Sequence, residues 1–224
     1  MSEWWKYTIS DFLLFSPRTY YRMIERYNDA VWPAQLATLA FGVVILVLLY
    51  RPALERRWII SGIIAVLWAF VAGAFLWMRY TTINWAATYF AGMFAIEVVL
   101  LARQPFRPRR DATGIIGLAL FIASLTLYPL LAPLLGRGLR QSEIFGVAPD
   151  PTVLATLGLL VVAEGPPRWW TLVVPLVWCL ISGATLWLMG SPEAWVLLAA
   201  PILVLGARRW RARVIAAPGD SGRT

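Results

Sequence analysis

Long apolar runs separated by short polar stretches make up most of the chain after residue 30. Two of them, residues 58–77 and 169–189, contain no charged residue, and about 20 apolar residues let a helix cross the hydrocarbon core of a bilayer. Seven segments follow this pattern, at 31–50, 58–78, 85–101, 114–135, 152–163, 169–189 and 194–207. The pattern predicts an all-α polytopic transmembrane helix bundle of about seven spans, of which the fifth and seventh are short.

The stretch "FSPRTYYRMIERYNDAVWPAQ", residues 15–35, has a different pattern. Ser16 suits an N-cap and Pro17 suits the first helical position. Apolar and charged residues then fall on opposite faces at helical spacing: Tyr20, Met23, Ile24, Tyr27 and Val31 on one, Arg18, Arg22, Glu25, Arg26 and Asp29 on the other. The segment 1–30 is therefore expected to hold an amphipathic helix in the membrane interface, with its arginines near lipid phosphates. It would serve as an anchoring collar or as a gating lid.

Two later stretches resemble each other. "LWAFVAGAFLWM" at 67–78 and "VWCLISGATLWL" at 177–188 match at an offset of 110 positions, and the same offset places Trp85 on Trp195. This predicts a parallel 3+1+3 arrangement with repeat A at 31–101, a linker span at 114–135 and repeat B at 152–207, as in some transporters. The alternative is chance similarity between apolar segments that end in interfacial tryptophans. The basic tail, 208–224, is expected to be disordered.

Charge indicates orientation. The clusters "RPALERR", "RQPFRPRR" and "RRWRAR" fall on the C-terminal side when seven spans are counted, and such clusters mark the cytoplasmic side. The prediction is a membrane protein with its N-terminus outside and its C-terminus on the cytoplasmic side. Charge alone does not settle this, because the tally of basic residues is unchanged if the fifth segment fails to cross.

Composition excludes several functions. The chain has no histidine and one cysteine, Cys179, within an apolar run. His-ligated haem, zinc sites with histidine, a histidine general base and an intramolecular disulfide are therefore impossible. We expect no metal, no cofactor and no nucleic-acid partner. An enzyme is not expected either, and a lipid-modifying enzyme using Glu97 or Asp150 is a third alternative that lacks paired catalytic groups.

Polar residues within or beside the apolar runs are the candidate site. Glu97 is an intramembrane acid with either a coupling or a structural role. Prolines at the start of the first and fifth segments, at 33 and 149–151, point to a substrate site in the outer half of the bundle, and Asp150 is expected to cap the fifth helix. The proposed substrate-binding set is Gln35, Thr38, Asn84, Trp85, Thr88, Asp150, Thr152 and Thr156. The alternative is that these are ordinary caps, interfacial aromatics and interhelical hydrogen bonds.

Three stretches resemble a known family: "YTISDFLLFSPRTYYR", "INWAATYFAGMFAIE" at 83–97 and "FGVAPDPT" at 145–152. The resemblance is to bacterial integral membrane proteins catalogued as a domain of unknown function, and it implies a multi-pass membrane protein without implying an activity. The residues themselves favour a permease or carrier for a small solute. The alternative is an accessory or scaffold subunit packing against another membrane protein, and lipids, a solute or a second copy are the expected partners.

Overall fold

The computed structural model describes residues 14–50, 56–109, 111–163 and 169–216. Within these ranges the chain is all-α, as predicted, and has no strand. The helices are α1 (Pro17–Ala30), α2 (Ala34–Tyr50), α3 (Arg56–Phe70), α4 (Ala87–Ala102), α5 (Ala112–Thr126), α6 (Leu131–Leu134), α7 (Pro149–Val162), α8 (Trp170–Leu188) and α9 (Ala194–Ala216). Four short segments complete the chain: the π-helical η3 (Val71–Trp77) and the 3-10 turns η4 (Tyr80–Thr82), η5 (Tyr128–Leu130) and η6 (Leu139–Gln141).

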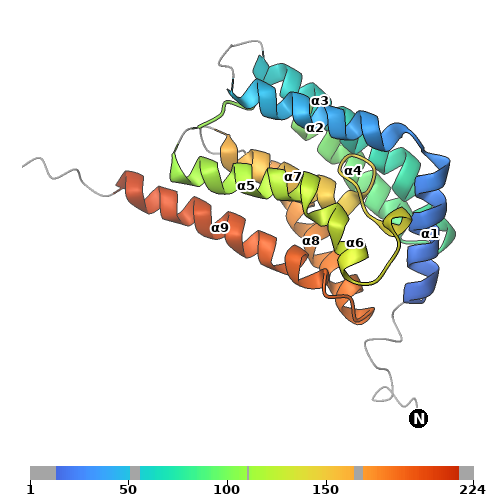
Figure 1. Cartoon of the computed structure of the whole chain (residues 1–224). Helices are drawn as coiled ribbons and strands as arrows, with labels where there is room; N and C mark the ends of the chain where they lie inside the picture. Colours follow the sequence, from blue (N-terminus) through green and yellow to red (C-terminus); the bar gives the residue numbers. More distant parts are fainter. Residues whose placement is uncertain (1–13, 51–55, 110, 164–168, 217–224) are drawn as a thin grey trace, which may run out of the picture.

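Helix α1 lies across one end of a bundle formed by the long helices (Figure 1). It meets α2 at a bend of 85°. The polar contacts of α1 reach the η6–α7 loop and the α8–α9 turn, so these connections share what we call the α1 end. At the opposite end, Ser61 near the start of α3 donates to the carbonyl of Gln104, and Arg109 N–H donates to the carbonyl of Val162. Successive long helices thus run back and forth between the two ends.

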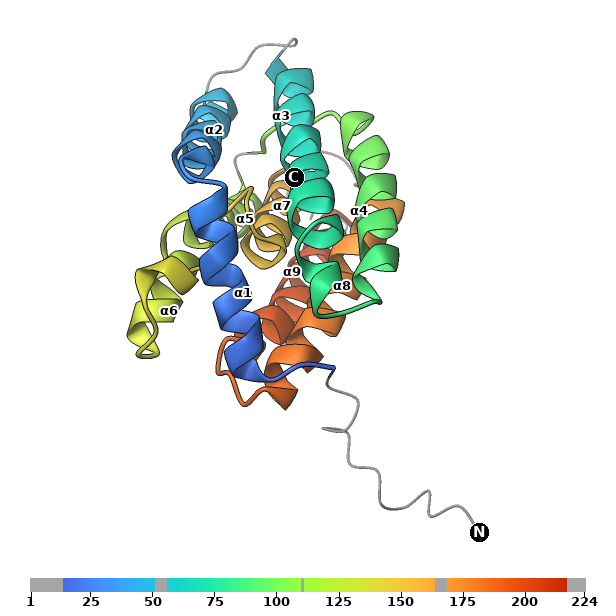
Figure 2. The same ribbon diagram turned by 90° about the vertical axis from the view of Figure 1, so that its right-hand side faces the viewer.

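Helix α7 is the centre of the bundle, and every one of its residues is buried. Viewed from the α1 end, it lies among the other helices (Figure 2). Its closest neighbour is α5, because Gly117 and Gly158 face each other. A Cβ added at Gly158 would lie 2.6 Å from the carbonyl oxygen of Gly117. Small residues let helix backbones approach in this way, as in membrane helix pairs.

Each predicted apolar segment corresponds to a helix or a helical stretch with similar bounds. The predicted number of spans, however, is only partly supported. Three helical stretches are long and apolar enough to cross a membrane: Trp58–Thr82, Ala112–Leu134 and Trp170–Leu188. The bent pair α1 and α2 would make a fourth if it is one span, while α4 and α7 are apolar but short. These lengths hold for the described ranges alone, so seven spans stays a prediction.

Two other expectations fare less well. The 3+1+3 repeat is not supported by the packing, because α7 is buried throughout whereas its counterpart α2 exposes many side chains. The matched Trp68 and Trp178 are both buried, but Trp68, from repeat A, donates its hydrogen bond to Thr156 of α7, in repeat B. Helix α9 runs to Ala216, so residues 208–216, expected to be disordered, are helical. Residues 217–224 lie outside the described ranges.

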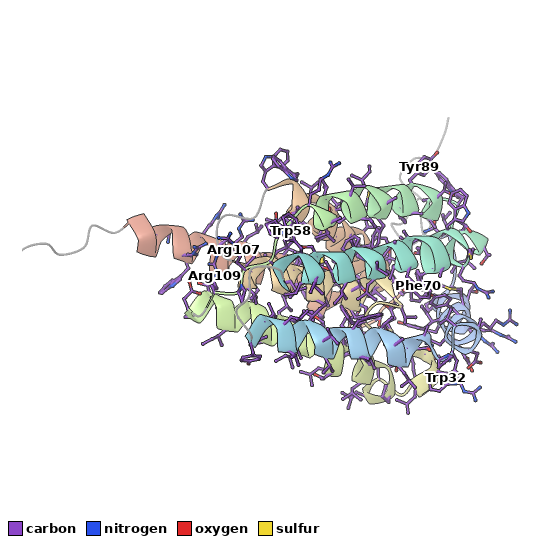
Figure 3. The ribbon with its side chains drawn as sticks, turned by 90° about the horizontal axis from the view of Figure 1, so that it is seen from above. Trp32, Trp58, Phe70, Tyr89, Arg107 and Arg109 are labelled. Carbon is purple, nitrogen blue, oxygen red and sulfur yellow. The ribbon has the colours of Figure 1, made fainter. Side chains whose placement is uncertain are left out.

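Exposed tryptophans gather at both ends of the bundle. The α1 end has Trp32, Trp77, Trp85, Trp187 and Trp195, and the opposite end has Trp58, Trp169, Trp170 and Trp210. Figure 3 shows Trp32 and Tyr89 at one end and Trp58, with Arg107 and Arg109, at the other. At about 1.5 Å per helical residue, positions 58 and 77 are roughly 28 Å apart, close to the ~30 Å hydrocarbon thickness of a bilayer.

Candidate functional site

Helix α1 forms as its sequence predicts, and it brings tyrosines to the bundle. The side chain of Ser16 accepts a hydrogen bond from Thr19 N–H, which confirms the expected cap. Tyr20, Met23, Ile24 and Tyr27 are buried on one face. This face packs on protein at the α1 end, and the placement of the helix in a membrane interface stays a prediction.

Asp150 is fully buried and accepts hydrogen bonds from three side chains. Trp178 Nε1 donates to Oδ1 at 2.7 Å, and Ser182 Oγ and the Tyr128 hydroxyl donate to Oδ2 at 2.8 and 3.2 Å. The expected helix cap at Asp150 is therefore wrong: α7 begins at Pro149 after Ala148, with no side-chain cap. One residue further into the helix, the carboxylate turns inward, where three neutral donors stabilise its ionised form.

Glu143 lies beside this group, in the loop before α7. The Tyr20 hydroxyl donates to its Oε1 at 2.8 Å, while its Oε2 is buried without a hydrogen-bond partner among the described residues. The residue as a whole is half-buried, but its carboxylate is not in water. Burial, and then the nearby charge of Asp150, raises the pKa of Glu143 well above its usual range. Burial thus favours the neutral, protonated form of Glu143.

A third acid, Glu193, stands at the start of α9 and is charge-paired. Arg137 forms an ion pair with it, and the Arg137 guanidinium lies 4.0 Å from the ring centroid of Tyr21. The Tyr21 hydroxyl donates to Ser191 Oγ at 3.0 Å, and Ser191 in turn bonds Glu193 at 2.7 Å. Burial raises the pKa of Tyr21 to about 12, so this hydroxyl stays a donor. We call the three acids and the tyrosines that bond them, Tyr20, Tyr21 and Tyr128, the acid–tyrosine cluster.

The cluster carries unbalanced negative charge. In the described part of the chain, Glu193 forms an ion pair with Arg137, but neither Glu143 nor Asp150 forms an ion pair with a basic residue. Two unpaired carboxylates in a dry site cannot both be ionised cheaply. No hydrogen bond joins Glu143 to Asp150 in the described part of the chain, but their charges influence each other, so a proton on one of the two acids relieves the repulsion.

A small cavity adjoins the cluster. It has a volume of about 10 Å³ and is lined by Tyr20 and Ser182, which bond Glu143 and Asp150, together with Phe75, Tyr80 and Trp178. Such a space holds one water molecule at most. Phe75 belongs to the π-helical η3, and π turns are frequent at functional sites.

Glu97 is a separate feature on α4, further from the α1 end. It is fully buried on the same face as Phe94 and Leu101. Neither of its carboxylate oxygens has a hydrogen-bond partner in the described ranges. The structural role predicted for Glu97 was an ion pair with Arg103. The ion pairs of the described residues do not include it.

The structure brings together only part of the expected substrate set. Thr156 accepts from Trp68 Nε1, and Thr152 accepts from Gly146 N–H, both beside Asp150 on α7. Gln35 and Thr38 are buried on α2, where Gln35 Nε2 donates to the carbonyl of Asn28 and Thr38 Oγ1 to that of Gln35.

The other three lie at the α3–α4 turn. Asn84 accepts from Ala86 N–H and donates its own N–H to the carbonyl of Tyr80, one of the cavity residues. Trp85 and Thr88 are exposed. The small cavity beside the cluster and three open surface hollows of the described region are lined by other residues, and none of these four linings includes any of the eight.

Sequence reasoning missed Glu143, Glu193, Tyr20 as a donor, Trp178 and Ser182. Apart from Ser191, which lies two positions before Glu193, their partners lie 28 to 172 positions away in the chain, so local spacing does not reveal them. A usable signal was present at Glu193, an acid in the short connection between the last two apolar segments.

Comparison with known proteins gives a family and no activity. No curated protein and no solved structure matches the chain. A family model described as "Family of unknown function (DUF6064)" matches residues 18–217, a range that includes α1, the acid–tyrosine cluster and Glu97. The resemblance to a family of unknown function is thereby confirmed, and the chain belongs to the DUF6064 family.

Proposed function

We propose that this protein is a multi-pass carrier of the bacterial inner membrane, which moves a small solute together with a proton bound by one of the two buried acids Glu143 and Asp150. The single observation that carries the proposal is the pair of buried acids that form no ion pair with a basic side chain in the described part of the chain. Ionisable groups inside a membrane protein are expensive and typically serve ion or proton pathways.

The membrane setting is supported by the surface of the bundle. The two groups of exposed tryptophans, roughly 28 Å apart along α3 and η3, match the aromatic belts at the two faces of a bilayer. Arginine is more frequent at the opposite end, which has nine of the described arginines against six at the α1 end (56, 57, 103, 107, 109, 208, 209, 211 and 213 against 18, 22, 26, 79, 137 and 140). By the positive-inside rule this end is cytoplasmic and α1 is outside.

The proton site would work by changing its exposure. In the closed arrangement Tyr20 of α1 caps Glu143, and the cavity beside it is too small for a solute. Movement of α1 away from the bundle would break the Tyr20–Glu143 bond and admit water. Glu143 would then lose its proton, because a hydrated carboxylate returns towards a pKa near 4.3. Exposure of the site and loss of the proton are thus linked.

The test is proton-coupled charge movement in reconstituted vesicles. Purified protein in liposomes is challenged with panels of amino acids, sugars and small carboxylates while transient currents and internal pH are recorded. We expect one class of solute to drive proton entry, with Glu143→Gln and Asp150→Asn inactive. Asp29→Asn, which removes an exposed acid paired with Arg140 at the same end, is the matched control and should stay active.

The closed packing itself favours a second candidate, an accessory subunit of another membrane protein. No described cavity could hold a solute between the helices. If no solute in the panels produces a current above that of protein-free vesicles, the carrier proposal fails. Stoichiometric copurification of one other membrane protein in mild detergent would then support the subunit.

A further inference from the structure

A second, separate site is suggested by the outer face of α1. An open hollow of about 460 Å³ lies between α1 and η4, and four arginines line it: Arg18, Arg22 and Arg26 of α1, and Arg79 at the end of the helix before η4. The α1 arginines follow one another at intervals of four residues and therefore share one side of the helix. The volume is within the range of small-molecule sites.

The lining of this hollow is cationic. Its lining contains no acid, and all four arginines are exposed. The ion pairs found in the described ranges involve Arg109, Arg137 and Arg140 instead. Four guanidinium groups around one space repel each other unless an anion lies between them, and planar guanidinium forks match phosphate oxygens well.

A comparison within the same helix sharpens this assignment. On its other side, α1 borders a hollow of about 520 Å³ that shares Arg18, Arg22 and Arg26 but also contains Glu25 and Asp29. There Glu25 and Asp29 contribute negative charge to the lining. Only the η4 side, where Arg79 adds a fourth cation, calls for an external anion.

The position of the hollow identifies the source of that anion. Arg79 directly follows the exposed apolar residues Trp77 and Met78, at the end of an apolar helix. Trp85 is exposed after η4. Exposed tryptophan at the end of an apolar helix marks the level of lipid headgroups. We propose that the hollow binds the phosphate of an anionic phospholipid headgroup, which holds α1 against the end of the bundle.

Native mass spectrometry of the detergent-purified protein tests the site, with phosphatidylglycerol and phosphatidylcholine of equal chain length as probes. We expect preferential binding of phosphatidylglycerol, weakened about fivefold by Arg79→Gln and about thirtyfold by Arg22→Gln with Arg79→Gln. Arg140→Gln, an exposed arginine at the same end outside the hollow, is the control and should bind like the parent. Because all three positions are exposed, the variants should fold, which circular dichroism verifies.

Three outcomes would overturn the proposal. Equal binding of the two lipids would show that the hollow does not recognise the charge of the headgroup. Equal weakening by Arg140→Gln would show attraction by overall charge alone. Displacement of the lipid by inorganic phosphate at the same concentration would assign the hollow to a free anion. Glu143→Gln should leave lipid binding unchanged, so the experiment tests the lipid site independently of the proposed proton site.

Discussion

The proton on Glu143 should be visible as a pH dependence of stability. Replacing Glu143 by glutamine leaves a neutral side chain of nearly the same shape that can still accept the Tyr20 hydrogen bond. In the parent, burial raises the pKa of Glu143, so the folded state keeps a proton that the unfolded state releases. The stability gained from this proton is complete below the unfolded pKa, near 4.3, and is lost as pH rises towards the folded pKa.

The magnitude follows from proton linkage. One proton held by the folded state and not by the unfolded state changes the free energy of unfolding by about 1.4 kcal/mol per pH unit. Between pH 5.5 and 7.5 the parent should therefore lose up to about 2.7 kcal/mol relative to Glu143→Gln. For a chain of this size that corresponds to a relative shift of roughly 5–10 °C in the unfolding midpoint.

Tryptophan fluorescence during thermal unfolding in neutral detergent measures this directly, since the chain has 13 tryptophans. Other titrating groups are common to both proteins and cancel in the difference. Asp29→Asn, at an exposed acid, should track the parent at both pH values. If Glu143→Gln and the parent lose stability in parallel, Glu143 does not hold the proton and the reasoning is wrong.

Three further predictions follow from the packing and orientation. Gly158→Ala should lower stability by about 1–3 kcal/mol, because its Cβ would meet backbone atoms of α5. Gly62→Ala, whose Cβ would have nothing within 4 Å, is the control and should be neutral or slightly stabilising; chemical denaturation measures both. Tyr20→Phe should cost about 1–2 kcal/mol at neutral pH, because it leaves a buried carboxylate oxygen unpaired; unchanged unfolding would refute the contact. Arg140→Cys should react with an impermeant maleimide in intact cells and Arg209→Cys only after permeabilisation, the buried Cys179 being silent; the reverse pattern would invert the topology.

The features that depend on residues close together in the sequence could be predicted from the sequence. The cap at Ser16 and the buried face of α1 follow from spacing within one helix, and apolar runs gave the helices to within a few residues. The direction of Asp150 was not accessible. An aspartate between two prolines has the composition of a cap, and only Tyr128, Trp178 and Ser182 turn it inward.

The predicted repeat is not supported by the packing, for a related reason. Trp68 and Trp178 are similar in being buried indoles that donate to α7, at Thr156 and Asp150. Their resemblance in sequence reflects this shared role at one central helix. It does not require two equivalent halves, and tertiary packing decides between these explanations.

The position of α1 also has a consequence for biosynthesis. It is the first described helix to leave the ribosome, yet Tyr20, Tyr21 and Asn28 bond residues that lie between 112 and 172 positions later. At about 5–20 residues per second, the last of these partners emerges on the order of ten seconds or more after α1. The aromatic face of α1 packs on Phe75 and Tyr80, which emerge earlier in that interval, so these contacts can form before the polar ones. The end of the bundle that α1 closes is thus the last part of the molecule to be completed.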